Sequence, residues 1–259
     1  TSLVSSVAKS IACSFKRIQF TPDILPSDIT GFSVYNPKTG NFEFKPGAVM
    51  SNIVLADEIN RTSPKTQASL LEVMEEHQVT VDDVTYKVPK PFMVLATQNP
   101  VEYLGTYPLP EAQLDRFTLK ISLGYPSSAD ESLILTRFKT HNPLHTLEPV
   151  ADGNYILELQ KIIREIHVDE SLNQYIVNIV SATRKHPDVI LGASPRGSLS
   201  LYRTSQAWAF YNGRNYVLPD DIKYVAPFVL CHRLRLNDRE RLKGTSTAEA
   251  LNGLLAKIP

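Results

Sequence analysis

Short apolar runs alternate with helical patterns over the first half of the chain. Between the runs, apolar residues recur three and four positions apart, which is typical of helices packed by one face. The runs are rich in Val, Ile, Leu and Phe, and we predict them as strands: Phe15–Phe20, Ile53–Ala56, Phe92–Thr97 and Phe117–Leu123. Strands and helices in this alternation predict a parallel α/β sheet.

Two further stretches alternate strictly between apolar and polar residues, which predicts β-hairpins added to the α/β core. Their turns fall at residues 36–40 and at Asp82-Asp83, both rich in turn-forming side chains. We expect the apolar residues of the two arms to share a face: Phe32 and Val34 with Phe42 and Phe44 in the first hairpin, and Val79 and Val81 with Val84, Tyr86 and Val88 in the second.

The strand signal fades after residue 126, and helical spacing replaces it. Four segments carry this spacing: Ile156–Ile166, Leu172–Thr183, Leu199–Tyr211 and Ile222–Leu234. A chain of 259 residues is long enough for two domains with separate cores. We therefore expect an αβα core over residues 1–126 and an α-helical domain over residues 127–259.

Composition removes several classes of partner. Lys plus Arg and Asp plus Glu both number 27, so the formal net charge is +0 and nothing attracts a polyanion at long range. No apolar run approaches the ~20 residues that span a bilayer, and the first residues lack a signal-peptide pattern. Cys13 and Cys231 belong to no CxxC pair. We expect a soluble cytoplasmic protein that binds neither nucleic acid nor membrane.

The apolar strand at Ile53–Ala56 ends directly in Asp57 and Glu58, which is the Walker B pattern. Both acids would emerge at the carboxyl edge of the sheet, where α/β proteins bind ligands. In phosphoryl transfer the first acid holds hydrated Mg²⁺, and the second orients or polarises the attacking water. A strand whose terminal acids merely cap a turn gives the same pattern, so the motif alone leaves both interpretations open.

A second apolar strand, Phe92–Thr97, leads into Gln98-Asn99-Pro100. If the two strands are neighbours, Asn99 would lie beside Glu58. Its amide could then donate to a γ-phosphate and accept from the water, the function called sensor 1. An isolated Asn-Pro is more often a turn, and only the neighbouring acidic strand favours the functional interpretation.

Three sequence blocks in this order resemble the MoxR family of AAA+ ATPases: Leu55–Arg61, Ala96–Pro100 and Tyr107–Phe117. The similarity continues in Gly192–Gly197 and Tyr216–Ile222, which look like the signatures of the family's lid domain. The resemblance implies an AAA+ αβα core with β-hairpin insertions, followed by an α-helical lid. It also implies ATP and Mg²⁺ as cofactors.

The resemblance assigns roles to two arginines. Arg116 occupies the position of an arginine finger that reaches the γ-phosphate bound by the neighbouring subunit. Arg196 follows a capping serine and a first-turn proline, Ser194-Pro195, and matches sensor 2, which contacts phosphate from the lid. Simpler interpretations stay open, because Arg116 could pair with a nearby acid and Arg196 could be a solvated surface arginine.

The chain opens with Thr1-Ser2-Leu3 and apolar residues at helical spacing. In the MoxR family the phosphate-binding loop ends in Gly-Lys-Thr or Gly-Lys-Ser and runs straight into an apolar helix. The resemblance therefore implies that Thr1 is the Mg²⁺-ligating hydroxyl. The glycines and lysine of that loop would precede residue 1, and without them we expect weak ATP binding.

The resemblance implies Mg²⁺-dependent ATP hydrolysis by a homo-oligomeric ring, a hexamer, that remodels a partner protein, often one with a von Willebrand factor A domain. The alternative is a nucleotide-insensitive assembly or binding module, if the phosphate loop is truly absent. A DNA motor of the related hairpin-bearing clade would need basic hairpin tips, and Asp82-Asp83 with only Lys38 argue against one.

Two other features predict no separate chemistry. His141 and His145 have the spacing of metal ligands, but the intervening Asn142-Pro143 prevents the helix that would align them. The aromatic segment around Trp208 could receive a base, yet packing within the lid is the expected role.

Overall fold

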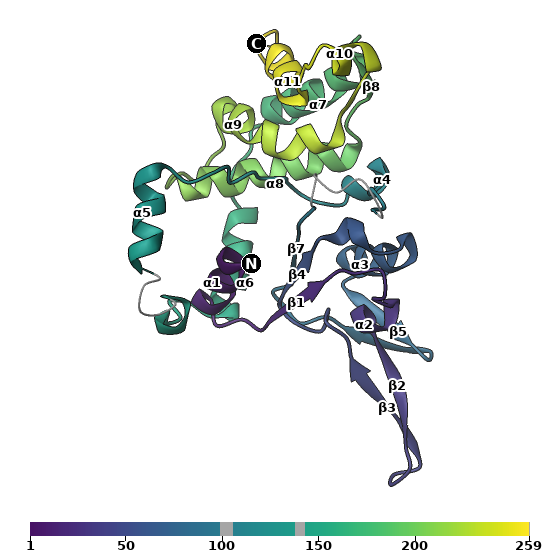
Figure 1. Ribbon diagram of the computed structural model, residues 1–259. Coiled ribbons are helices and arrows are strands. Elements are labelled where there is room, and N and C mark those ends of the chain that lie inside the picture. The colour runs from purple at the N-terminus through teal and green to yellow at the C-terminus, as the bar shows by residue number, and fades with distance from the viewer. Residues whose placement is uncertain (99–105, 138–142, 259) are drawn as a thin grey trace. The chain divides into compact units, whose positions relative to one another are not determined.

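The computed structural model describes residues 1–98, 106–137 and 143–258, which form two compact units (Figure 1). The first unit comprises Thr1–Leu109 and Gly124–Glu158, and the second comprises Pro110–Leu123 and Leu159–Pro259. This division differs from the single boundary expected at residue 126. Pro110–Leu123 belongs with the second unit because a buried arginine of that unit binds its backbone, as described below.

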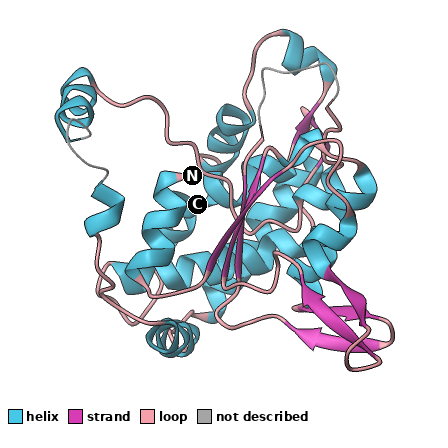
Figure 2. Ribbon diagram, turned by 60° about the horizontal axis from the view of Figure 1, so that its bottom comes forward, coloured by secondary structure: helices cyan, strands magenta, loops and turns pink. Residues whose placement is uncertain are grey.

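The first unit is built around a parallel sheet formed by three of the described strands, with β4 in the middle (Figure 2). Its elements are α1 (Ser2–Ser10), β1 (Phe15–Gln19), α2 (Pro26–Thr30), β2 (Gly31–Asn36), β3 (Asn41–Pro46), β4 (Ile53–Asp57), α3 (Pro64–Glu76), β5 (Gln78–Val81), β6 (Val84–Lys87), β7 (Met93–Ala96) and α5 (Ser128–Arg137). The parallel register pairs Gln19 with Asp57 and Ala56 with Ala96, so the three strands end at one edge.

Strand β4 is apolar because both of its faces are buried. Ile53 and Leu55 pack against Val4 and Ala8 of α1, and the side chains of β4 that alternate with them are also fully buried. A strand buried on both faces is expected to be continuously apolar, as β4 is. The strands predicted around β1, β4 and β7 are confirmed.

Helix α3 begins at a capping serine. The Oγ of Ser63 accepts a hydrogen bond from the backbone N–H of Thr66, and Pro64 occupies the first helical position. Leu70 and Leu71 are fully buried and fix the face that the helix turns to the core. Helix α3 thereby holds the segment that follows Asp57 and Glu58 against the unit.

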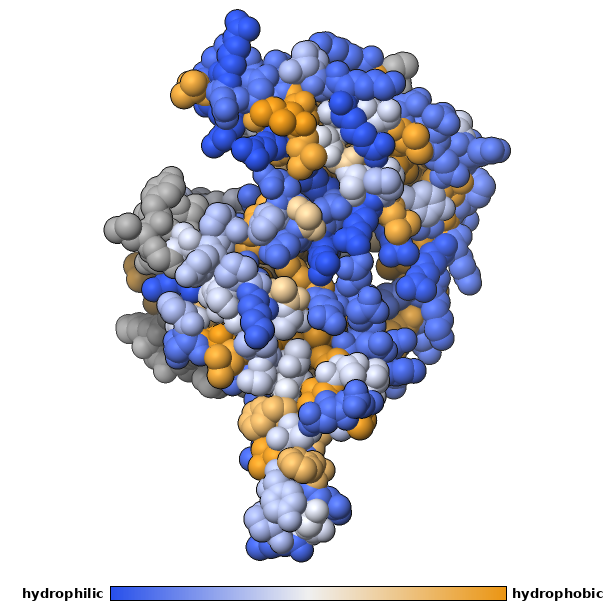
Figure 3. Space-filling view, turned by 90° about the vertical axis from the view of Figure 1, so that its right-hand side faces the viewer, coloured by the Kyte–Doolittle hydropathy of each residue, from blue (hydrophilic) through white to orange (hydrophobic). Residues whose placement is uncertain are grey.

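The hairpin β2–β3 extends away from the sheet (Figure 1), and its end is polar or of intermediate hydropathy (Figure 3). Its register places Tyr35 opposite Phe42, with ring centroids 5.5 Å apart. The predicted face shared by Phe32 and Val34 with Phe42 and Phe44 is therefore wrong. The turn spans four residues, which shifts the register by one and turns each side chain of one arm to the opposite face.

The hairpin β5–β6 has the predicted register. Val79 lies opposite Tyr86, and Val81 lies opposite Val84. Both turn residues, Asp82-Asp83, have positive φ values of 49° and 64°, as a two-residue hairpin turn requires. The ring of Tyr86 also stacks on Phe44 of the other hairpin, with centroids 3.9 Å apart, so the two hairpins support each other.

The second unit is mainly helical, and the predicted helices of this half are confirmed. Its elements are α4 (Glu111–Leu114), the end of α6 (Gly153–Arg164), α7 (Glu170–Lys185), β8 (Val189–Leu191), α8 (Pro195–Tyr211), α9 (Pro219–Leu230), β9 (Arg235–Leu236), α10 (Asp238–Leu242) and α11 (Thr247–Leu255). Fully buried Ile179, Leu201 and Ile222 bring α7, α8 and α9 into one core. Trp208 stacks on Tyr224 at 4.2 Å, which agrees with a packing role for this aromatic segment.

The predicted strand at Phe117–Leu123 is wrong, since these described residues belong to no helix or strand. The N–H of Lys120 donates to the carbonyl of Phe228 in α9 at 2.8 Å, and Leu119 and Ile121 are exposed. A short apolar run predicted a strand here, but the helical unit binds the backbone of this segment instead.

Candidate functional site

Three oxygen-bearing side chains meet at the carboxyl edge of the sheet. Asp57 is the last residue of β4, and Thr97 directly follows β7 beside it. The Oγ1 of Thr97 donates to Oδ1 of Asp57 at 2.5 Å, and Oγ1 of Thr1 donates to Oδ2 at 3.4 Å. The N-terminal helix and two strands thus bring Thr1, Asp57 and Thr97 together, although 40 residues or more separate Asp57 from each of the others.

Arg17 of β1 forms an ion pair with the same aspartate. Its Nη2 and Nε lie 2.6 Å and 3.0 Å from Oδ2 of Asp57. Partial burial acts to raise the pKa of Asp57, but hydrogen bonds from Thr97 and Arg17, together with the positive charge of Arg17, outweigh it. The pKa of Asp57 therefore lies below its usual value, and the side chain is an anion at neutral pH.

Glu58 stands in the left-handed region, with φ 57° and ψ 48°. A non-glycine residue adopts this conformation rarely, and such strained positions concentrate at functional sites. Its N–H donates to Oγ1 of Thr97 at 2.9 Å, and its Oε2 accepts from Arg61 at 3.0 Å. The turn places the Glu58 carboxylate at the sheet edge directly after Asp57.

Gln19 connects the two acids through Arg17. Its Nε2 donates to Oε2 of Glu58 at 2.9 Å, and its Oε1 accepts from Nη2 of Arg17 at 2.7 Å. Asp57, Arg17, Gln19 and Glu58 thus form a continuous polar chain across two strands. Arg17 and Gln19 were not predicted from the sequence, although two polar residues spaced by two within the predicted strand Phe15–Phe20 were a usable signal.

The remaining predicted site residues are Asn99, Arg116 and Arg196. Asn99 falls outside the described residues, so its role as sensor 1 stays a prediction. Arg116 and Arg196 belong to the second unit, and both are exposed. Arg116 follows α4, whereas Arg196 is the second residue of α8, where its N–H donates to Oγ of the N-cap Ser194 at 3.1 Å.

Comparison with known proteins decides the family. Residues 1–119 match the model of the ATPase family associated with various cellular activities (AAA), and residues 181–252 match the AAA lid domain. The chain is 43% identical over 245 residues to Chaperone MoxR1 of Mycobacterium tuberculosis, a match that covers 91% of this chain and 64% of that protein. The chain belongs to the MoxR family of AAA+ ATPases.

Two further relatives extend the match along this MoxR-family chain. YeaC of Bacillus subtilis, an uncharacterized protein, is 55% identical over 258 residues, which covers 100% of this chain and 81% of YeaC. A crystal structure from Cytophaga hutchinsonii, described as a candidate ATPase, has 44% identity and a TM-score of 0.93, and covers 100% of this chain and 81% of its own. The AAA+ α/β fold with a helical lid is therefore confirmed.

The oxygen atoms at the sheet edge suit Mg²⁺. This ion is bound in phosphate-transfer sites by one or two protein oxygens together with substrate phosphates and water. The Thr1 hydroxyl and the ionised Asp57 carboxylate are within hydrogen-bond distance, as the loop threonine and Walker B aspartate of such a site should be. Over the described ranges, no cluster of three His, Cys, Asp or Glu side chains offers a metal site. The predicted absence of a site at His141 and His145 concerns side chains that are not described.

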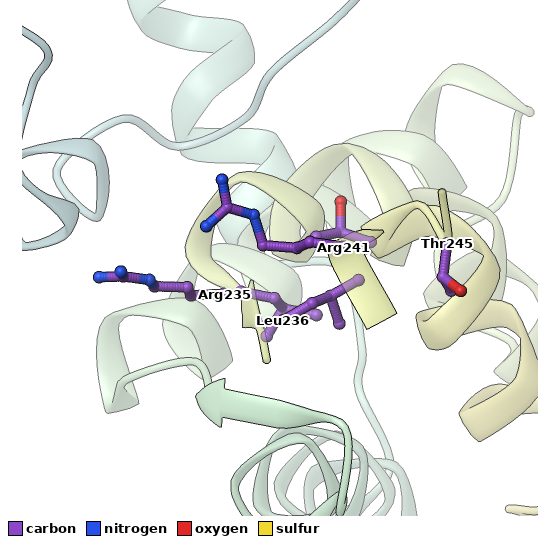
Figure 4. Close-up of a pocket in the computed structure, with 6 residues that line it drawn as sticks. Arg235, Leu236, Arg241 and Thr245 are labelled. Atoms are coloured by element: carbon purple, nitrogen blue, oxygen red, sulfur yellow. The ribbon is translucent and has the colours of Figure 1, made fainter. Parts of the chain in front are cut away.

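A shallow pocket in the second unit is lined in part by basic side chains, in contrast to the acidic edge of the sheet (Figure 4). It has a volume of about 190 Å³, and its walls include Arg235 and Arg241. Arg235 pairs with Glu111 at 3.0 Å and Arg241 pairs with Asp238 at 3.4 Å. Because acids compensate both guanidinium charges, this pocket is a poor site for phosphate.

In the part of the chain that the structure describes, no helix has both the length and the apolar character needed to cross a membrane.

Proposed function

We propose that this MoxR-family protein hydrolyses ATP with Mg²⁺ and uses the cycle to remodel a partner protein. The convergence of Thr1, Asp57, Glu58 and Thr97 at one sheet edge supports the proposal most strongly. Mg²⁺, when bound with ATP, would neutralise charge on the β- and γ-phosphate oxygens. Thr1 and Asp57 are the residues that would hold it.

Glu58 is the residue that we assign to the attacking water. Its carboxylate can accept a hydrogen bond from that water and orient the oxygen toward the γ-phosphorus. The hydrogen bond that the Glu58 N–H donates to Oγ1 of Thr97 fixes the backbone that carries this side chain. Asn99 would act on the same water as sensor 1, and Arg196 would contact phosphate from the lid.

A ring of identical subunits completes this proposal. Arg116 would enter the site of a neighbouring subunit and stabilise charge on the transferred phosphoryl group. We propose a homo-oligomeric ring, with six subunits by family resemblance. Its client would be a protein, and proteins that carry a von Willebrand factor A domain are the candidates.

The substitution Glu58→Gln tests the catalytic role directly. We expect turnover of ATP to fall by on the order of 100-fold or more, with ATP still bound, because the amide cannot act as a base. Phosphate release and the affinity for a fluorescent ATP analogue measure the two quantities on protein expressed from its complete reading frame.

The matched control is Glu72→Gln, which makes the same chemical change at an exposed position of α3. This variant should retain the turnover of the unmodified protein. Full activity of Glu58→Gln would remove Glu58 from its role. A protein that binds no ATP at all would instead support the nucleotide-insensitive binding module.

A further inference from the structure

Arg233 is almost completely buried in the second unit, with its side chain 1% exposed. It follows α9 in a short 3₁₀ turn and forms an ion pair with Oδ1 of Asp115 at 2.9 Å. The same guanidinium donates to the carbonyls of Asp115, Phe117 and Thr118 at 3.2, 2.6 and 3.1 Å. One side chain therefore binds the backbone of four consecutive residues at three points.

Arg116 lies within the span that Arg233 holds. The carbonyls on both sides of it accept from the same guanidinium, while the side chain of Arg116 itself is exposed. The planar donor fork of arginine fixes several acceptors in one geometry, which a lysine cannot do. The backbone position of Arg116 is thus set by Arg233.

Asp115 also connects this span to the start of α8. Its second oxygen, Oδ2, accepts from Oγ of Ser194 at 2.7 Å. Ser194 is the N-cap of α8, and its Oγ also accepts from the N–H of Arg196. A single carboxylate therefore joins the turn that carries Arg116 to the helix start that carries Arg196.

Apolar burial does not explain how this segment is held. None of the four described residues of α4 is buried. Leu119, Ile121 and Leu123, which follow the residues that Arg233 binds, are exposed. A buried ion pair often adds little stability compared with apolar side chains of the same volume, but it can select one geometry. Arg233 and Asp115, which we call the polar clamp, therefore give this segment a defined position.

We infer that Arg233 and Asp115 are positioning residues that fix Arg116 relative to Arg196, so that the lid unit presents both arginines as one rigid pair. The inference rests on the proposed function, in which both arginines contact phosphate. It adds a reason why Pro110–Leu123 belongs with the second unit.

The substitution Asp115→Asn tests the inference, with Asp221→Asn as a matched control. Asp221 lies in the same unit and pairs with Arg214 at 2.5 Å; it is buried, whereas Asp115 is partly buried. We expect Asp115→Asn to lower kcat by on the order of tenfold or more, while nucleotide affinity changes less than about twofold. Asp221→Asn should change kcat less than about twofold, even where it lowers the melting temperature comparably.

Subunit mixing separates positioning of Arg116 from a general structural defect. Asp115→Asn subunits keep Glu58, whereas Glu58→Gln subunits keep the clamp and Arg116. Rings made from both should regain turnover, because an intact Arg116 then enters a site with an intact Glu58. Arg116→Ala mixed in the same way provides the reference level of recovery.

A second variant covers the case in which Asp115→Asn does not fold. Ser194→Gly removes the hydroxyl that binds Asp115, and glycine is an acceptable N-cap, so α8 should persist. It should also lower kcat and recover on mixing. Unchanged kcat in the folded variants, or no recovery on mixing, overturns the inference. Unmodified protein that fails to hydrolyse ATP overturns the proposed function, and this inference with it.

Discussion

At the scale of single residues, one hydroxyl connects the two acids of the site. Thr97 donates to Asp57 and accepts from the N–H of Glu58, so it holds one carboxylate and the backbone of the next. Threonine is common in strands, and nothing in its sequence position distinguishes this role from ordinary strand propensity.

The substitution Thr97→Val should remove the hydrogen bonds to Asp57 and Glu58 and keep the shape of the side chain. We expect the pKa of Asp57 to rise, kcat for ATP to fall by roughly tenfold, and the free energy of unfolding to fall by about 1 kcal/mol. An aspartate with a lowered pKa stabilises the fold above its unfolded pKa and loses that effect as pH falls through the folded pKa. Thr97→Val should therefore weaken the acid sensitivity in urea unfolding, and Thr97→Ser should preserve it.

The sequence predicted part of this site. The Walker B pattern and the MoxR resemblance predicted Thr1, Asp57 and Glu58 together, and the structure brings them to one edge. Arg17 and Gln19 were missed because Phe15–Phe20 was predicted only as a strand of the sheet, with no role for its polar side chains. Among the described strands β1 lies at the end of the sheet, where polar side chains can reach across to its neighbour.

At the scale of elements, the errors of sequence analysis have a common origin. A short apolar run predicted a strand at Phe117–Leu123, but the local sequence carries no information about Arg233, which is more than 100 residues away and binds this segment. The β2–β3 register was wrong because the turn length, and not the apolar pattern, sets which residues are opposite.

Substituting alanine for each of two glycines should change the stability of the protein in opposite directions. A Cβ at Gly47 would lie 2.2 Å from the carbonyl oxygen of Ile29, so Gly47→Ala should destabilise the base of the hairpin by more than about 2 kcal/mol. A Cβ at Gly253 of α11 meets nothing within 4 Å, so Gly253→Ala should stabilise that helix by about 0.5 to 1 kcal/mol. Urea unfolding measures the free energy of unfolding of both variants. If both substitutions changed it in the same direction and by the same amount, the packing at these glycines would be wrong.

At the scale of the whole molecule, the two units should differ in their response to acid. Burial and the charge of Arg233 lower the pKa of His232 from 6.5 to about 4 in the second unit. The unfolded chain then binds a proton between these pH values and the folded chain does not, so stability falls as pH drops from 6.5 to 4.

This loss should reach roughly 3 kcal/mol for the second unit by pH 4, since each pKa unit corresponds to about 1.4 kcal/mol. Urea midpoints measured across this pH range test the prediction. His232→Gln removes the titrating ring and should flatten the profile over the same range. A profile that His232→Gln leaves unchanged would assign the acid response to other groups.

We predict that one edge of the sheet binds ATP and its metal ion. The most direct test is a crystal of Glu58→Gln, expressed from the complete reading frame and grown with ATP and Mn²⁺ in place of Mg²⁺, measured by anomalous scattering. We predict an anomalous peak beside the Thr1 hydroxyl and the Asp57 carboxylate, with the γ-phosphate facing position 58. Nucleotide bound with Mn²⁺ at any other part of the protein would rule out this site.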